Sequence, residues 1–159
     1  MGKFCHICAM ETLNFEHYPM SIKNKENKRY IFDVIRKKDL LLTPEEWVRQ
    51  HCIQFLLQEK KYPMSLINVE KAIQVYGKIK RYDIIVFKPN GKVKVLVECK
   101  APHIPLDQAV FDQIARYNLQ VDSEYLMVTN GLQHIYCQLD YHHKTYQFLR
   151  ELPSYSIKS

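Results

Sequence analysis

The strongest constraint on the fold comes from three charged residues, Asp83, Glu98 and Lys100, inside the most apolar part of the sequence, residues 81–100. This part has two segments rich in Val and Ile, which are typical of β-strands, joined by a Pro- and Gly-containing turn. A charged side chain inside a sheet is costly unless it is paired or bound to a cation. A metal site is the most economical explanation, and an ordinary hairpin with an exposed polar face is the alternative.

The pairing register of this hairpin decides whether the two carboxylates meet. Side chains alternate along a strand, so Glu98 and Lys100 share one face. The other face is apolar: Val95, Val97 and Cys99. A loop with an even number of residues pairs Asp83 with Glu98, about 4.5–5.5 Å apart at Cβ, whereas an odd loop exchanges the faces. We expect the even register, which also pairs the following residues: Ile85 with Leu96, and Phe87 with Lys94.

Length and charge narrow the class of protein. The chain has 159 residues, which fits one domain. Its net charge of +6 points to an anionic partner such as nucleic acid, and a surface that is basic without such a partner is an equal alternative. No apolar run approaches the roughly 18 residues that span a bilayer, and the first residues lack the apolar core of a signal peptide. We therefore expect a cytoplasmic protein without a membrane segment.

The five cysteines do not form a disulfide pattern. They are scattered and odd in number: Cys5, Cys8, Cys52, Cys99 and Cys137. Cys5 and Cys8 have half of a zinc-binding spacing, but no second Cys-x-x-Cys follows. We expect a reduced N-terminal tail.

The remaining elements predict an α/β (α+β) fold with a mixed central sheet flanked by helices. Thr43, Pro44 and Glu46 form a helix start, and the helix is expected to run to about Lys60; a second runs from about Leu106 to Leu119. Other strands are expected within residues 21–36, 67–75, 124–129, 133–139 and 145–149. We assign residues 1–29 to an extended N-terminal segment and residues 30–159 to a single domain.

These residues resemble the PD-(D/E)XK nuclease pattern: Asp83, then Glu98-Cys99-Lys100, then Gln113 and Tyr117 in the Gln-x-x-x-Tyr spacing of the RecB-like branch. More closely, residues 97–102, 111–117 and 128–131 are similar to the N-terminal endonuclease domain of type I restriction enzyme R subunits. The resemblance covers roughly residues 30–150. Tyr82 stands where many members have proline before the acid.

The resemblance implies a Mg²⁺-dependent DNA endonuclease of restriction–modification, with Mn²⁺ as an expected substitute. Asp83, Glu98 and the backbone carbonyl of Cys99 would hold the ion, and Lys100 would assist the attacking water or stabilise the developing charge. Gln113 would orient the water or Lys100. The resemblance also implies DNA contacts by Arg116 and Tyr117. Glu45 and Glu46 are implied as accessory carboxylates, or they serve only to cap the helix.

The expected partners are double-stranded DNA and separate motor or specificity subunits. The family's R subunits continue into helicase-type motor modules, so we expect ATP-driven translocation to reside outside this chain. A second class of function also fits the residues. In that alternative the chain is a nuclease-fold DNA-binding or assembly module that is not catalytic alone.

Overall fold

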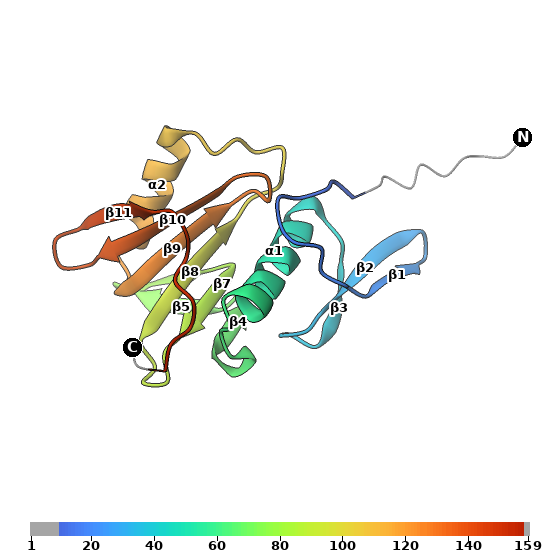
Figure 1. The fold of residues 1–159 in the computed structure, drawn as a ribbon, viewed down its shortest axis with the longest axis horizontal. Helices are drawn as coiled ribbons and strands as arrows, with labels where there is room; N and C mark the ends of the chain where they lie inside the picture. The colour runs from blue at the N-terminus through green and yellow to red at the C-terminus, as the bar shows by residue number, and fades with distance from the viewer. Residues whose placement is uncertain (1–9, 158–159) are drawn as a thin grey trace, which may run out of the picture.

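The computed structural model describes residues 10–157, which form a small α+β domain (Figure 1). A π-helical turn at Phe55–Glu59 continues the first helix, and a short 3-10 helix at Met64–Leu66 precedes the fourth strand. The strands and α-helices follow in chain order: β1 (Ile22–Lys25), β2 (Lys28–Asp33), β3 (Lys38–Leu41), α1 (Pro44–Gln54), β4 (Ile67–Val69), β5 (Ala72–Val75), β6 (Lys78–Arg81), β7 (Ile84–Phe87), β8 (Val93–Cys99), α2 (Gln108–Asn118), β9 (Ser123–Thr129), β10 (His134–Asp140) and β11 (Thr145–Leu149).

The central sheet has six strands in the order β11-β10-β9-β8-β7-β4. Strands β8 and β9 are parallel and are joined by α2, whereas the other neighbours are antiparallel, so the sheet is mixed. Two smaller sheets lie outside it: β1-β2-β3 and the β5-β6 hairpin. The predicted mixed central sheet flanked by helices is confirmed.

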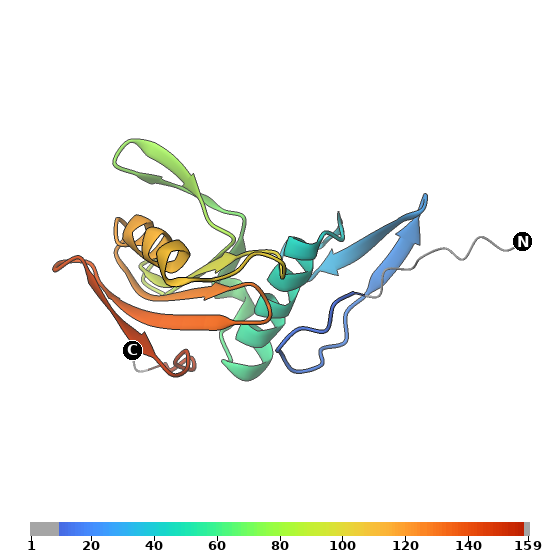
Figure 2. The same ribbon diagram turned by 90° about the horizontal axis from the view of Figure 1, so that it is seen from above.

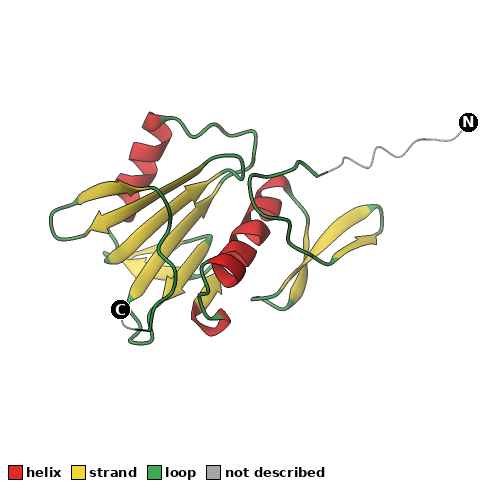
Figure 3. Ribbon diagram, viewed as in Figure 1, coloured by secondary structure: helices red, strands yellow, loops and turns green. Residues whose placement is uncertain are grey.

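Two hydrophobic cores lie on opposite faces of this sheet, one packed with each helix. The two helices are the red ribbons beside the yellow sheet in Figure 3. Strand β8 contributes to both, because its side chains alternate. Val95, Val97 and Cys99 share one face, as the sequence predicts, and this face packs with α1, while Leu96 packs with α2. The small β1-β2-β3 sheet lies on the far side of α1 from the central sheet (Figure 1).

The register between β7 and β8 is the even one. Ile84 pairs with Val97, and Ile85 pairs with Leu96 as predicted. The predicted pairing of Phe87 with Lys94 is wrong, because a bulge between Val86 and Phe87 shifts the register at the loop end of the hairpin. Phe87 pairs instead with Val93, and Lys94 is the extra residue of the bulge.

The first helix begins as the sequence predicts: the side chain of Thr43 accepts a hydrogen bond from the backbone N–H of Glu46 at 3.1 Å. The single strand predicted over residues 67–75 is wrong. Glu70 adopts a left-handed conformation with φ of 51°, which breaks the segment into β4 and β5 in two different sheets.

The N-terminal residues that the structure describes cross the α1 face. Leu13 and Tyr18 are buried in the α1 core, and the N–H of Asn14 donates to the carbonyl of Gly131 at 2.7 Å. The strands predicted within residues 21–36 are present and pair as the β1-β2 hairpin, whereas β3 lies outside the predicted strands. The Cys5 and Cys8 pattern lies outside the described residues.

Across residues 10–157, neither helix has the length and apolar character needed to cross a bilayer.

Candidate functional site

The carboxyl end of β8 brings Asp83 and Glu98 together. Asp83 lies in the bend before β7, and its Oδ2 accepts a hydrogen bond from the backbone N–H of Cys99 at 2.8 Å. Glu98 is half-buried on the opposite strand. Burial and the adjacent Asp83 carboxylate raise the pKa of Glu98 to about 7, while the cations Lys80 and Lys100 act in the opposite direction. Burial and the neighbouring Asp83 charge thus both favour the protonated form of Glu98.

Lys100 follows directly after β8 and is half-buried beside this pair. Its backbone N–H donates to the carbonyl of Thr129 at 2.8 Å, which holds the residue against the end of β9. The positive charge of Lys100 opposes the rise in the pKa of Glu98 and the rise in the pKa of Glu45, so both acids lie within its electrostatic reach. The three residues of the predicted acid-acid-lysine set are therefore gathered at one place.

The two accessory candidates at the start of α1 differ in their surroundings. Glu45 lies near Asp83: burial and then the Asp83 charge raise its pKa, although Arg49 and Lys100 oppose the shift. Glu46 is buried and bound on several sides, and its carboxylate contacts Arg36 at 2.5 Å and also Arg49. Glu45 thus belongs to the site, whereas Glu46 supports the residues around it.

Arg49 on α1 is the central cation of the site and was not found from the sequence. Its Nη2 donates to Asp83 Oδ1 at 2.7 Å and to Glu45 Oε1 at 2.9 Å, and it lies 3.5 Å from Glu70. The guanidinium is buried, and its Nε has no hydrogen-bond partner among the described residues. These contacts raise the pKa of Arg49 above its usual value, despite burial. The spacing of Arg49 from Glu45, four residues, was the available signal.

A second arginine joins this network to the outer sheet. Arg36 contacts Asp33 through Nε at 2.7 Å, Glu46 at 2.5 Å and Glu70 at 3.3 Å. Asp33 is fully buried, and although burial opposes it, hydrogen bonds from Arg36 and Gln50 lower its pKa. The chain of ion pairs fixes the start of α1 relative to Asp83.

The residues predicted on α2 lie on its exposed face. Gln113, Arg116 and Tyr117 are solvent-exposed. Only Tyr117 is connected to the carboxylates, through Lys80 of β6, whose Nζ lies 2.9 Å from the Tyr117 ring centre. Lys80 is buried, which lowers its pKa to about 8, while the charge of Glu98 opposes that shift. The structure does not join Gln113 or Arg116 to the acids by a described contact.

Tyr82 completes the α2 side of the site and was also missed. Its ring is fully buried and its hydroxyl has no hydrogen-bond partner in the described part of the chain. Burial first, then the negative charge of Glu98, raises the pKa of Tyr82 above its usual value. The Lys80 ammonium lies 4.4 Å from the ring centre.

The donor set fits a Mg²⁺ ion held by two carboxylates. No group of three or more His, Cys, Asp or Glu side chains in residues 10–157 forms a ready cage. Mg²⁺ does not need one, because it keeps several waters and often takes only one or two carboxylates. Asp83 and Glu98 supply hard oxygen atoms. The pKa of Glu98 is raised by burial first and then by repulsion from Asp83, and a bound cation would counter both effects.

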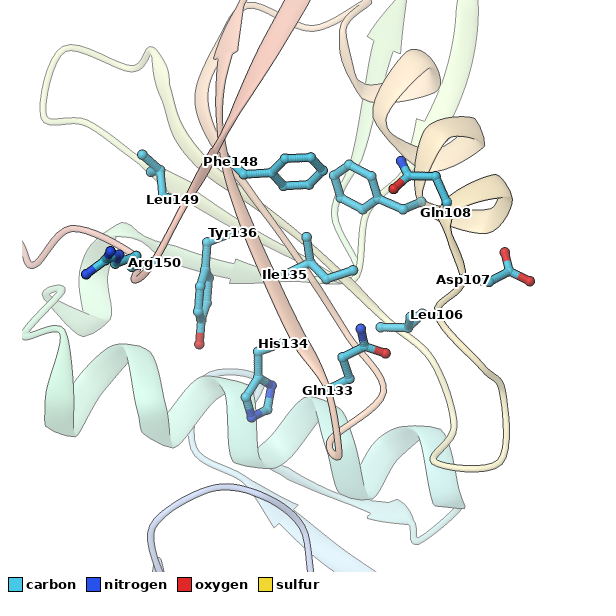
Figure 4. Close-up of a pocket in the computed structure, with 11 residues that line it drawn as sticks. Leu106, Asp107, Gln108, Gln133, His134, Ile135, Tyr136, Phe148, Leu149 and Arg150 are labelled. Carbon is cyan, nitrogen blue, oxygen red and sulfur yellow. The ribbon is translucent and has the colours of Figure 1, made fainter.

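A cavity of about 500 Å³ lies elsewhere, beside β10, β11 and the start of α2 (Figure 4). Its walls combine apolar side chains such as Ile135 and Phe148 with polar ones such as His134 and Arg150. Its one lining carboxylate, Asp107, caps α2 by accepting from the N–H of Val110 at 2.8 Å. The cavity is therefore separate from the carboxylate pair.

Comparison with known proteins gives one family match. The family model described as type I restriction enzyme R protein N terminus (HSDR_N) matches residues 44–153. No curated protein matches the chain. A solved fragment described as an HsdR subunit of a type I restriction enzyme from Vibrio vulnificus YJ016 is 21% identical, with a TM-score of 0.47 over 71% of this chain. The match covers 24% of that solved chain.

Proposed function

The chain belongs to the family of type I restriction enzyme R protein N termini, and from this membership we propose that it is a Mg²⁺-dependent DNA endonuclease acting in restriction–modification. The reaction is hydrolysis of a phosphodiester bond in double-stranded DNA. Motor and specificity functions would come from separate subunits.

One observation carries the proposal: the paired carboxyls of Asp83 and Glu98 with Lys100 beside them at the end of β8. Burial and the Asp83 charge raise the pKa of Glu98 to about 7. A carboxyl whose pKa is strongly raised by burial and by a specific charged neighbour is a candidate for a functional site. The family match includes all three residues, since it spans residues 44–153.

The roles follow from the chemistry of each group. Asp83 and Glu98 would hold the ion, together with the backbone carbonyl of Cys99. When bound, the ion supplies Lewis-acid charge to the phosphate and to the attacking water. Lys100 would donate to the phosphate oxygens on which negative charge develops. Glu45 would serve as an additional outer carboxylate beside Asp83.

The exposed residues of α2 would act on the substrate side. Gln113 would orient the nucleophilic water or Lys100, and Arg116 and Tyr117 would contact the DNA backbone. Phosphate contacts of this kind release counterions, so duplex affinity should fall with salt at a slope of about −0.9 per neutralised phosphate. The slope should be nearly independent of DNA sequence.

A second function remains supported by one observation. Both oxygens of Asp83 are already engaged, Oδ1 by Arg49 and Oδ2 by the N–H of Cys99. An acid held in this way favours a nuclease-fold DNA-binding or assembly module that does not cut by itself. If the chain is a nuclease, the Asp83 carboxylate must bind the metal ion and Arg49 at the same time.

The test is cleavage of supercoiled plasmid with and without Mg²⁺, by the chain alone and by the chain assembled with its motor and specificity subunits. Glu98→Gln should abolish cleavage while leaving duplex binding intact. Lys100→Ala should reduce the rate by at least about a hundredfold, as loss of a transition-state charge partner does. Lys92→Ala, at an exposed lysine of the β7-β8 turn, is the matched control and should cut normally.

Mn²⁺ is expected to support the weakened variants better than Mg²⁺, because it tolerates imperfect octahedral geometry. Cleavage by the assembled complex that persists undiminished in both Glu98→Gln and Lys100→Ala would replace the nuclease with the non-catalytic module.

A further inference from the structure

A cavity of about 360 Å³ lies between the β5-β6 hairpin, the carboxyl end of α2 and the β10-β11 hairpin. The β5-β6 hairpin and α2 lie on the same side of the central sheet (Figure 2). Lysines and tyrosines dominate the lining: Tyr76, Lys78, Lys80, Tyr117 and Lys144. No acidic side chain lines the cavity within the described part of the chain. The cavity is therefore both positively charged and aromatic.

Helix capping explains only part of this composition. Lys80 donates to the carbonyl of Tyr117 at 3.3 Å, and Lys144 donates to the carbonyl of Leu119 at 2.9 Å. Both ammonium groups thus stabilise the carboxyl end of α2, which carries partial negative charge. Lys78 is exposed on the hairpin and is not accounted for in this way.

Packing accounts for little of the Tyr76 side chain. Its side chain is 72% exposed at the tip of the hairpin, where its hydroxyl lies 3.2 Å from that of Tyr141. Tyr76 and Gly77 form a two-residue turn with φ of 48° and 76°. That turn favours Asn-Gly, and an aromatic residue in the left-handed region is energetically unfavourable. An exposed ring on a strained backbone contributes little to folding, and it is free to contact a ligand.

The cavity adjoins the candidate catalytic site. Lys80 lines the cavity and also acts electrostatically on Glu98. The Tyr117 ring, 48% exposed, covers the Lys80 ammonium on one side and borders the cavity. A strand bound here would therefore lie next to the carboxylate pair.

We propose that this cavity binds single-stranded DNA, with an unpaired base stacked on Tyr76 and neighbouring phosphates at Lys78 and Lys144; this rests on the proposed function. Exposed aromatic rings in a basic groove are the features that bind unpaired bases without sequence preference. A base inside a duplex has both faces covered by its neighbours, so only an unpaired strand can use the tyrosine. The site would accept the strand opened or frayed beside the cut.

The experiment is fluorescence anisotropy of a labelled oligothymidylate and of a labelled duplex, in EDTA so that no cleavage occurs. Tyr76→Asn suits the turn and should leave the fold intact, yet lower oligothymidylate affinity by about tenfold, because one base loses its stacking partner. Its duplex affinity should stay within about twofold. Tyr76→Phe should retain oligothymidylate binding. Lys78→Gln should weaken single-strand binding more than the control Lys92→Gln, which lies outside the cavity.

Oligothymidylate binding by Tyr76→Asn at the wild-type level would overturn the proposal, as would equal losses in Lys78→Gln and Lys92→Gln. Absence of oligothymidylate binding by the wild type would overturn it as well. The assay contains no metal, so it fails or succeeds independently of cleavage. A selective Tyr76 effect, together with cleavage by the assembled complex that persists undiminished in Glu98→Gln and Lys100→Ala, would keep this site and reject the nuclease.

Discussion

Replacing Glu98 by glutamine should stabilise the metal-free protein at alkaline pH. Burial and the Asp83 charge raise the pKa of Glu98 from 4.5 to about 7, so the folded state holds this proton more tightly than the unfolded chain does. Between those two values the folded chain carries more protons, and stability falls as pH rises. Above about pH 7 the folded state bears the full free-energy cost of an ionised Glu98, whereas below pH 4.5 Glu98 is protonated in both states and this cost is absent. Glutamine never ionises and avoids the penalty.

The size of the effect follows from the shift. One pKa unit corresponds to about 1.4 kcal/mol, so the full shift is about 3 kcal/mol. Glu98 is only half-buried, so solvent screens part of this, and we expect about 2 kcal/mol at pH 8. At pH 4.5 the gain should fall below about 0.5 kcal/mol.

The assay is urea unfolding in EDTA at pH 4.5 and pH 8, followed by the fluorescence of Trp47, the single tryptophan. Glu26→Gln, in the exposed β1-β2 turn, removes the same charge and should change stability little at either pH. A pH-independent gain in Glu98→Gln, or a loss of stability that grows from pH 4.5 to pH 8, would refute the account of this carboxylate pair.

Three other substitutions test the fold around the site by urea unfolding at pH 7. Arg49→Met should cost about 3–5 kcal/mol, because it leaves buried carboxylates without their cation; an unchanged midpoint would contradict this. Thr43→Ala should cost about 1 kcal/mol by removing the α1 cap, and a cost near zero would show that the cap is dispensable. Gly131→Ala should cost more than Gly91→Ala, since both have positive φ but only the first places a Cβ 2.8 Å from Leu13; equal costs would contradict the close approach.

Much of the site could be predicted from sequence because its signals are local. The Thr43 cap lies within one turn of the helix it starts, and the even hairpin register brings Asp83 to Glu98 through a short loop. Both depend on residues close together in the chain. Such features obey turn and capping rules that a single sequence carries.

The missed residues depend on packing between distant segments. Arg49 reaches Asp83 only because α1 packs on the face of β8 that carries Cys99. Lys80 reaches Glu98 because a break at Glu70 turns the β5-β6 hairpin out of the central sheet. A glutamate with positive φ carries no sequence signal of the kind that glycine gives. The strand break could therefore not be predicted from the sequence. The same holds for the α2 side of the site, which depends on this break.

The most direct test of the central claim is a Mn²⁺ titration followed by electron paramagnetic resonance, which measures free Mn²⁺ without requiring DNA cleavage or partner subunits. The account predicts that the wild type binds Mn²⁺ in competition with Mg²⁺, and that Asp83→Asn and Glu98→Gln each lose this binding while Glu26→Gln keeps it. Equal Mn²⁺ binding by the wild type and both site variants would contradict the claim that Asp83 and Glu98 hold the ion.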